Sequence, residues 1–187
     1  MKRSVILCLF LMAGLFSVVL AQAPATAPKP SPELQRTAVY WGHWTYEGET
    51  KPGPLGPGGK VTGEWDAQMI LNAFFLQGRW TEKAATGETR GLEIWWYDPQ
   101  DKNFHYSVYR DNGVTFSGVL TNSGNIWKWD DKAVVAGKEY PLRGTQVFAS
   151  DFKSITEKLE VSIDGKTWTI FSGGTWKFTK VQPAPKK

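Results

Sequence analysis

From Gly42 to Lys180 the chain alternates short runs of aromatic and β-branched residues with turn signals about every 8–15 residues. Such runs are typical of β-strands, and no helical pattern of useful length separates them. A parallel sheet needs crossover helices, so the pattern predicts an all-β, antiparallel fold, either a barrel or a strongly curved sandwich. We expect about ten strands, at residues 43–50, 60–67, 74–82, 89–97, 103–110, 114–121, 125–130, 138–149, 154–163 and 166–180.

The dipeptide Asp164-Gly165 predicts a two-residue hairpin turn, because type I′ geometry needs a positive φ at both central positions. A two-residue loop fixes the register of its hairpin. One face of this hairpin then carries apolar side chains, namely Ile155, Leu159, Val161, Trp168, Ile170, Trp176 and Phe178. Glu157 is an acid on that apolar face.

Asn112-Gly113 predicts a second turn of the same kind. Its register, extended through a turn at Ser123-Gly124, brings apolar and polar side chains onto one inner face. The expected members of this face are His105, Tyr109, Phe116, Leu120, Trp127 and Trp129.

The first 21 residues have the pattern of a secretory signal peptide. Lys2 and Arg3 precede an apolar run over residues 5–20, and the small residues near its end suit cleavage after Ala21. An uncleaved anchor is the alternative for an apolar run of this length. The one cysteine, Cys8, leaves with the signal, so the mature chain has no thiol chemistry or Cys-bound zinc. We therefore expect a periplasmic or secreted protein.

The mature chain divides into three parts. Residues 22–31 are rich in Ala and Pro and predict an extended linker. Ser31-Pro32-Glu33 has the cap, first-turn proline and early acid of a helix start, so we expect a short helix over residues 32–39. This helix opens a single domain at residues 32–181, and residues 182–187 are expected to form a disordered tail.

The charges do not favour a nucleic-acid-binding surface. The chain has 22 basic and 18 acidic residues, and removal of Lys2 and Arg3 with the signal leaves 20 basic residues and a net charge of +2. The remaining basic residues are scattered among acids, which is typical of a solvated surface. We expect no nucleic-acid partner, and no stable membrane insertion once the signal is removed.

Motifs for known chemistries fail at specific positions. The glycine-rich segment 53–60 has Pro54 where a phosphate loop needs Gly, and Val61 where Ser or Thr would bind magnesium. With only His43 and His105 in the chain, a three-histidine metal centre cannot form, and two His with a carboxylate is the remaining arrangement. We predict no metal, no cofactor and no catalytic residue.

Several segments, taken in chain order, form a recognisable set: Ser31-Pro32-Glu33-Leu34, Gly42-His43-Trp44, Gly56-Pro57-Gly58-Gly59, Phe74-Phe75-Leu76, Gly91-Leu92 and Tyr97-Asp98-Pro99. The set resembles an uncharacterised bacterial family of exported lipocalin-like proteins, a domain of unknown function, over about residues 33–180. This resemblance implies a closed, up-and-down antiparallel β-barrel around a central cavity. It brings no established activity with it, and Ser107 stands where a His is often seen.

Together these features favour a barrel that binds a small, mostly apolar ligand in an aromatic-lined cavity without chemical conversion. The candidate ligand-binding residues are His105, Tyr109, Trp127, Trp129, Glu157 and Trp168. One alternative is a carbohydrate or cell-envelope interaction module that uses an exterior ring of Trp95 or Trp96. Another is a barrel enzyme in which Glu157 and His105 form an acid–base pair. The sequence carries no signal of an oligomeric state.

Overall fold

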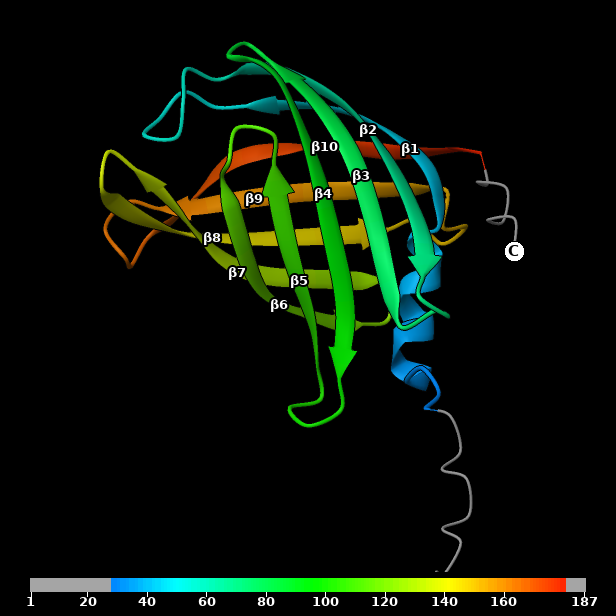
Figure 1. Cartoon of the computed structure of the whole chain (residues 1–187). Coiled ribbons are helices and arrows are strands. Elements are labelled where there is room, and N and C mark those ends of the chain that lie inside the picture. Colours follow the sequence, from blue (N-terminus) through cyan, green and yellow to red (C-terminus); the bar gives the residue numbers. More distant parts are fainter. Residues whose placement is uncertain (1–27, 181–187) are drawn as a thin grey trace, which may run out of the picture.

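Ten antiparallel strands close into one barrel (Figure 1). The computed structural model describes residues 28–180, so the predicted signal peptide, most of the linker and the tail lie outside the described residues. The strands are β1 (Gly42–Thr50), β2 (Gly59–Ile70), β3 (Phe75–Ala84), β4 (Gly87–Asp98), β5 (Asn103–Arg110), β6 (Thr115–Ser123), β7 (Ile126–Val135), β8 (Lys138–Phe148), β9 (Ser154–Ser162) and β10 (Trp168–Lys180). Each strand pairs with its neighbour in the chain and β10 pairs with β1. The predicted up-and-down barrel is confirmed, and the sandwich alternative is wrong.

A short 3₁₀-helix, η1 (Pro32–Tyr40), lies at one end of the barrel (Figure 1). It begins where the sequence predicts a helix. The Ser31 Oγ accepts a hydrogen bond from the Glu33 backbone N–H at 3.2 Å, and Pro32 occupies the first turn, where a missing N–H costs nothing. Within residues 28–180, no helix is long and apolar enough to cross a membrane.

Tyr40, the last residue of η1, plugs this end of the barrel. Its side chain is completely buried, and its phenol Oη donates a hydrogen bond to Gln146 Oε1 at 2.7 Å. The plug meets four rings edge-on, at centroid distances of 4.8–5.5 Å, from Trp65, Trp95, Trp127 and Phe148. Edge-to-face contacts of this kind stabilise aromatic cores. We call this filled region, next to η1, the near half of the barrel.

Large rings inside the barrel lie across glycines of adjacent strands. Trp129 stands opposite Gly144, and a Cβ at Gly144 would lie 2.0 Å from Trp129 Cε2. A Cβ at Gly91 would likewise lie 2.2 Å from Cζ2 of Trp80, its cross-strand partner. No larger residue fits at these positions unless the ring moves. The same relation holds for the pairs Tyr106 with Gly118 and Trp65 with Gly78.

The turn between β5 and β6 is longer than predicted. It has three residues, 111–113, because the backbone N–H of Arg110 donates to the carbonyl of Val114 at 2.9 Å. Gly113 takes a positive φ of 82°, as expected at the last position of a three-residue hairpin loop. Phe116 therefore pairs with Val108, whereas the predicted two-residue turn would pair it with Tyr109.

This shift of one residue exchanges the faces of β5, because successive side chains of a strand point to opposite sides. Phe104, Tyr106 and Val108 are buried inside the barrel. His105 and Tyr109 point outward, and Tyr109 is 49% exposed. The prediction that His105 and Tyr109 line the inner face is wrong.

The loop between β9 and β10 also differs from its prediction. It spans residues 163–167, and Asp164 Oδ1 accepts the backbone N–H groups of Lys166 and Thr167 at 2.8 and 2.7 Å. A bulge between Ile170 and Ser172 then changes the register once more.

As a result, the large apolar side chains before the bulge point outward, and those after it point inward. Ile170 is 42% exposed, and Trp168 lies outside the barrel with the Arg143 guanidinium carbon 4.4 Å from its ring centroid. The predicted inner position of Trp168 is wrong. Trp176 and Phe178 pack against the core as predicted.

In the hairpin of β6 and β7 the register differs from prediction by two residues, and the predicted inward-facing side chains are still correct. Its turn is Gly124-Asn125, so Leu120 pairs with Trp129 and not with Trp127. A displacement of two residues preserves the face of each side chain. Leu120, Trp127 and Trp129 therefore all point inward, as predicted.

The close contact at Gly144 can be tested by mutation. In Gly144→Ala the new methyl group must displace the Trp129 ring, and overpacking of this kind costs about 1–3 kcal/mol. We expect urea unfolding to show that loss. Gly53→Ala is the matched control, because nothing lies within 4 Å of a Cβ at that position. Equal stabilities of the two variants would contradict the ring-on-glycine packing.

Candidate functional site

Away from η1, several inward-facing side chains of the barrel keep part of their surface accessible. We call this region the far half. Its inward-facing, partly exposed residues are Trp80, Glu93, Phe116, Trp129, Glu157 and Trp176. These side chains point into the barrel and keep part of their surface accessible.

Glu157 lies at the boundary between the two halves and joins a chain of hydrogen bonds that starts at the plug. Tyr40 donates to Gln146 Oε1, and Gln146 Nε2 donates to Glu157 Oε2 at 2.5 Å. The indole Nε1–H of Trp176 donates to the same oxygen at 3.1 Å. Burial raises the pKa of Glu157 above its ordinary range, and these hydrogen bonds oppose the rise.

Glu93 is the second carboxyl of the interior. The Trp95 Nε1–H donates to Glu93 Oε2 at 3.1 Å. Burial, reinforced by the charge of Glu157, raises the pKa of Glu93 from 4.5 to about 7, against the lowering effect of the Trp95 hydrogen bond. Glu93 is therefore poised to change charge near neutral pH.

The Trp65 indole lies beside Glu93 without a hydrogen-bond acceptor. Its Nε1 is buried, and the residue is 5% exposed. A Cβ at Gly78 would lie 2.0 Å from this Nε1 and 2.9 Å from Glu93 Cγ, so the donor and the carboxyl flank the same point. A buried N–H without a partner costs free energy. This donor therefore suggests that an acceptor from outside the chain can occupy the position beside it.

A third polar group occupies the far half. The Arg110 guanidinium carbon lies 5.3 Å from the ring centroid of Trp80 and 5.5 Å from that of Phe116, and Arg110 Nε is buried without a partner. Nearby, Tyr106 Oη donates to Asp131 Oδ2 at 2.9 Å. Burial raises the pKa of Asp131, and the charge of Arg110 partly offsets this rise.

The six residues predicted to bind ligand divide equally between the two sides of the wall. Trp127, Trp129 and Glu157 point inward, although Trp127 is only 1% exposed and is enclosed by other rings. His105, Tyr109 and Trp168 point outward. The proposed acid–base pair of Glu157 and His105 is wrong, because the wall of the barrel separates these residues.

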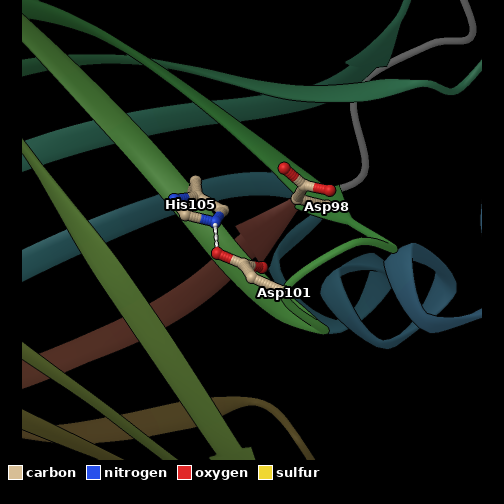
Figure 2. Close-up of side chains that lie close together, drawn as sticks. All are labelled: Asp98, Asp101 and His105. Carbon is tan, nitrogen blue, oxygen red and sulfur yellow. Dashed lines mark hydrogen bonds and ion pairs between the residues drawn. The ribbon is translucent and has the colours of Figure 1, made fainter.

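His105 belongs instead to a cluster at the β4–β5 turn, which Figure 2 shows on the outer face. His105 Nε2 lies 2.7 Å from Asp101 Oδ2, and one ligand atom each from Asp98, Asp101 and His105 lie within 4.8 Å of one another. This donor set suits a cation. The two carboxylates also accept backbone N–H groups of the turn, from Gln100 at 2.8 Å and Asn103 at 2.9 Å, so the cluster has a structural role in shaping the hairpin.

The exterior offers less for an interaction module than the sequence suggested. Trp95 points inward and is 5% exposed, so its exterior role is wrong. Trp96 points outward, but one face of its ring stacks on His105, with centroids 5.4 Å apart. A groove of about 480 Å³ lies over β1–β4, and apart from Tyr46 and Gly63 it is lined by threonines and charged residues.

Sequence reasoning missed most of the polar interior. Glu93, Arg110, Asp131 and Tyr40 were not among the predicted site residues. Glu93 had a usable signal, since it alternates with Gly91 and Trp95 and must share their face. Asp131 had the same kind of signal, since it alternates with Trp129, whose inner face was predicted correctly. Arg110 had none, because its direction depends on the β5–β6 turn, which is one residue longer than predicted.

The comparisons with known proteins give a family and a fold. A family model described as "Protein of unknown function (DUF1579)" matches residues 29–177. No curated protein matches the chain. Rv2717c from M. tuberculosis, a crystal structure, has a TM-score of 0.57 at 14% identity and covers 81% of this chain and 100% of its own. A de novo designed fluorescence-activating β-barrel has a TM-score of 0.39 at 12% identity and covers 76% of this chain and 96% of its own. The first likeness supports the barrel fold, and the second is too distant to add to it.

The raised pKa of Glu93 predicts a specific dependence of stability on pH. The folded protein holds this proton more tightly than the unfolded chain, so stability falls as pH rises from about 4.5 to about 7. Glu93→Gln removes this loss, so its free energy of unfolding should rise relative to that of wild type by up to about 3 kcal/mol between pH 4.5 and pH 8. Urea unfolding at both pH values measures it. Glu64→Gln, an exposed carboxylate of β2, should leave the wild-type dependence intact, and the same profile in Glu93→Gln would contradict the assignment.

Proposed function

The chain belongs to the DUF1579 family, whose description assigns no function, and we propose from its own barrel that it is a binding protein that holds a small ligand in the far half. The observation that carries this proposal is the accessible surface of several inward-facing rings and carboxyls in the far half. The near half is filled by Tyr40 and its four rings, whereas inward-facing rings and carboxyls of the far half keep accessible surface. A barrel selected only for stability would bury such rings fully.

The oxygens of Glu93 and Glu157 support the presence of interior space. In each carboxyl Oε2 accepts the hydrogen bonds, and Oε1 accepts none from the described residues. Neither Oε1 is buried: the buried side-chain atoms without partners are Trp41 Nε1, Trp65 Nε1 and Arg110 Nε. The free oxygens therefore border space that a water molecule or a ligand atom can reach.

The proposed ligand has an apolar body and a polar group. Trp80, Phe116 and Trp129 offer ring surface for the body, at roughly 25 cal/mol per Å² of apolar area removed from water. The polar group would meet Glu93 and Glu157 at the boundary with the near half. Because Tyr40 closes the end at η1, the ligand would come in from the opposite end.

We propose binding without chemical conversion. Glu93 and Glu157 are held by indole and amide N–H groups, and the acid–base partner expected for Glu157 lies outside the wall. A pair of groups for general acid–base catalysis has to reach one common substrate position.

A blocking substitution tests the proposal. Leu159 points inward opposite Gly144, and Leu159→Trp should fill part of the far half. We expect the uncharged fluorescent probe N-phenyl-1-naphthylamine to bind wild type saturably, and Leu159→Trp to bind it at least about tenfold more weakly, since the added ring takes the same space. Ile170→Trp, an outward position on the neighbouring strand, is the matched control and should bind as wild type does. No saturable binding to wild type, or equal binding by Leu159→Trp, would overturn the proposal.

We further propose that the protein meets its ligand outside the cytoplasm, after cleavage at Ala21. The support is the signal-like sequence of residues 1–21 and the lack of cysteine after Cys8. When the full chain is expressed in a Gram-negative bacterium, intact mass measurement of the periplasmic fraction should give a chain that begins at Gln22. A chain that retains Met1 in the membrane fraction would favour the uncleaved anchor instead.

A further inference from the structure

The acids inside the barrel lack a matching positive charge. Among residues 28–180, no ion pair includes Glu93 or Glu157. Glu82 adds a third acid, whose charge raises the pKa of Glu157. Arg110, the inward-facing cation, acts on Asp131. Buried charges are ordinarily paired, so the two central carboxyls call for a partner.

The groups around these carboxyls are arranged for their ionised forms. Trp95 donates to Glu93, and the unpaired Trp65 N–H lies beside it. Gln146 and Trp176 both donate to Glu157. Hydrogen-bond donors favour a carboxylate over a carboxylic acid. These donors oppose the effect of burial on both carboxyls, and no ion pair among the described residues balances the charge of either one.

The two carboxyls point inward from opposite walls of the barrel and share one set of packed side chains. Glu93 is on β4 and Glu157 on β9, and four strands separate β4 from β9 in either direction around the barrel. Both nevertheless connect to Tyr40: Trp95, which donates to Glu93, packs on Tyr40 with ring centroids 4.9 Å apart, and Tyr40 donates to Gln146, which in turn donates to Glu157. A group bound between the free Oε1 atoms would touch both walls.

We infer that the ligand's polar group is a monovalent organic cation, such as an ammonium, held between Glu93 and Glu157. This inference rests on the proposed function and names its ligand class. Aromatic rings complete the site: Trp95 and Trp176 donate to the carboxyls, and Tyr46 packs on Trp176 with centroids 4.7 Å apart. Rings and carboxylates together are the usual surroundings of bound ammonium groups.

Other ligand classes fit less well. An anion would meet Glu82, Glu93 and Glu157 together. A divalent metal ion needs three or more ligand groups within reach of one point, and in the described part of the chain only Asp98, Asp101 and His105 meet that condition, outside the barrel. A neutral polar group would leave the carboxyls without a counter-charge.

The test uses three probes with one naphthalene body and different charge. The full chain is titrated calorimetrically at pH 7.5 with 1-naphthylmethylamine, 1-naphthalenemethanol and 1-naphthoate. The amine is protonated at this pH, the alcohol is neutral and the naphthoate is negative, so the comparison separates the effect of charge from that of apolar contact. We expect wild type to bind the amine at least about tenfold more tightly than the alcohol, and the naphthoate least. In Glu93→Gln/Glu157→Gln, folding being checked by circular dichroism, the amine and the alcohol should bind equally. Glu64→Gln, on the outer face, should keep the preference.

The outcomes separate the two proposals. If wild type binds the alcohol as tightly as the amine, or if the double variant keeps the preference, the cation inference is wrong while binding in the barrel stands. If none of the three probes binds wild type and N-phenyl-1-naphthylamine also fails to bind, both proposals are wrong.

Discussion

Several of the large rings inside this barrel fit because the adjacent strand places a glycine under the ring. Trp80 lies over Gly91 and Trp129 over Gly144, and a Cβ at either glycine would overlap the ring. The interior can therefore hold many rings without pushing the strands apart. Ring and glycine on neighbouring strands also oppose any slip of register, since a slip would place a side chain under a ring. The closure of ten strands depends on this fit.

The Tyr40 plug at η1 makes the two ends of the barrel interior different. Tyr40 fills the near half and begins the hydrogen-bond chain through Gln146 that orients Glu157. The inward-facing carboxyls Glu93 and Glu157 then lie at the boundary of the filled region or beyond it. A carboxyl supported from behind by rings and amides is held in one orientation, which lowers the entropic cost of presenting it to a ligand.

The fold followed from the sequence because turn signals and β-rich runs recur along the whole chain. The side to which a strand's side chains point could be predicted only where the register was correct or differed by an even number of residues. Trp129 points inward although its predicted pairing was misplaced by two residues. His105 and Trp168 were assigned to the wrong side because a three-residue turn and a five-residue loop look like two-residue turns in sequence. Glu157 was found from its exceptional place on an apolar face. The partners of Glu157 and Glu93 lie on distant strands, and no local pattern reports such distant contacts.

The seam between β1 and β10 has a consequence for how the molecule forms. Trp44 pairs with Phe178 across that seam, so two residues from opposite ends of the domain become neighbours in the ladder. Closing nearly the whole chain into one loop costs conformational entropy before the hydrogen bonds of the seam can form. Contacts of such high sequence separation slow folding. Until the seam forms, β1 and β10 are open edges able to pair with another chain. Closure of the seam thus also removes the two edges through which the chain could pair with another molecule.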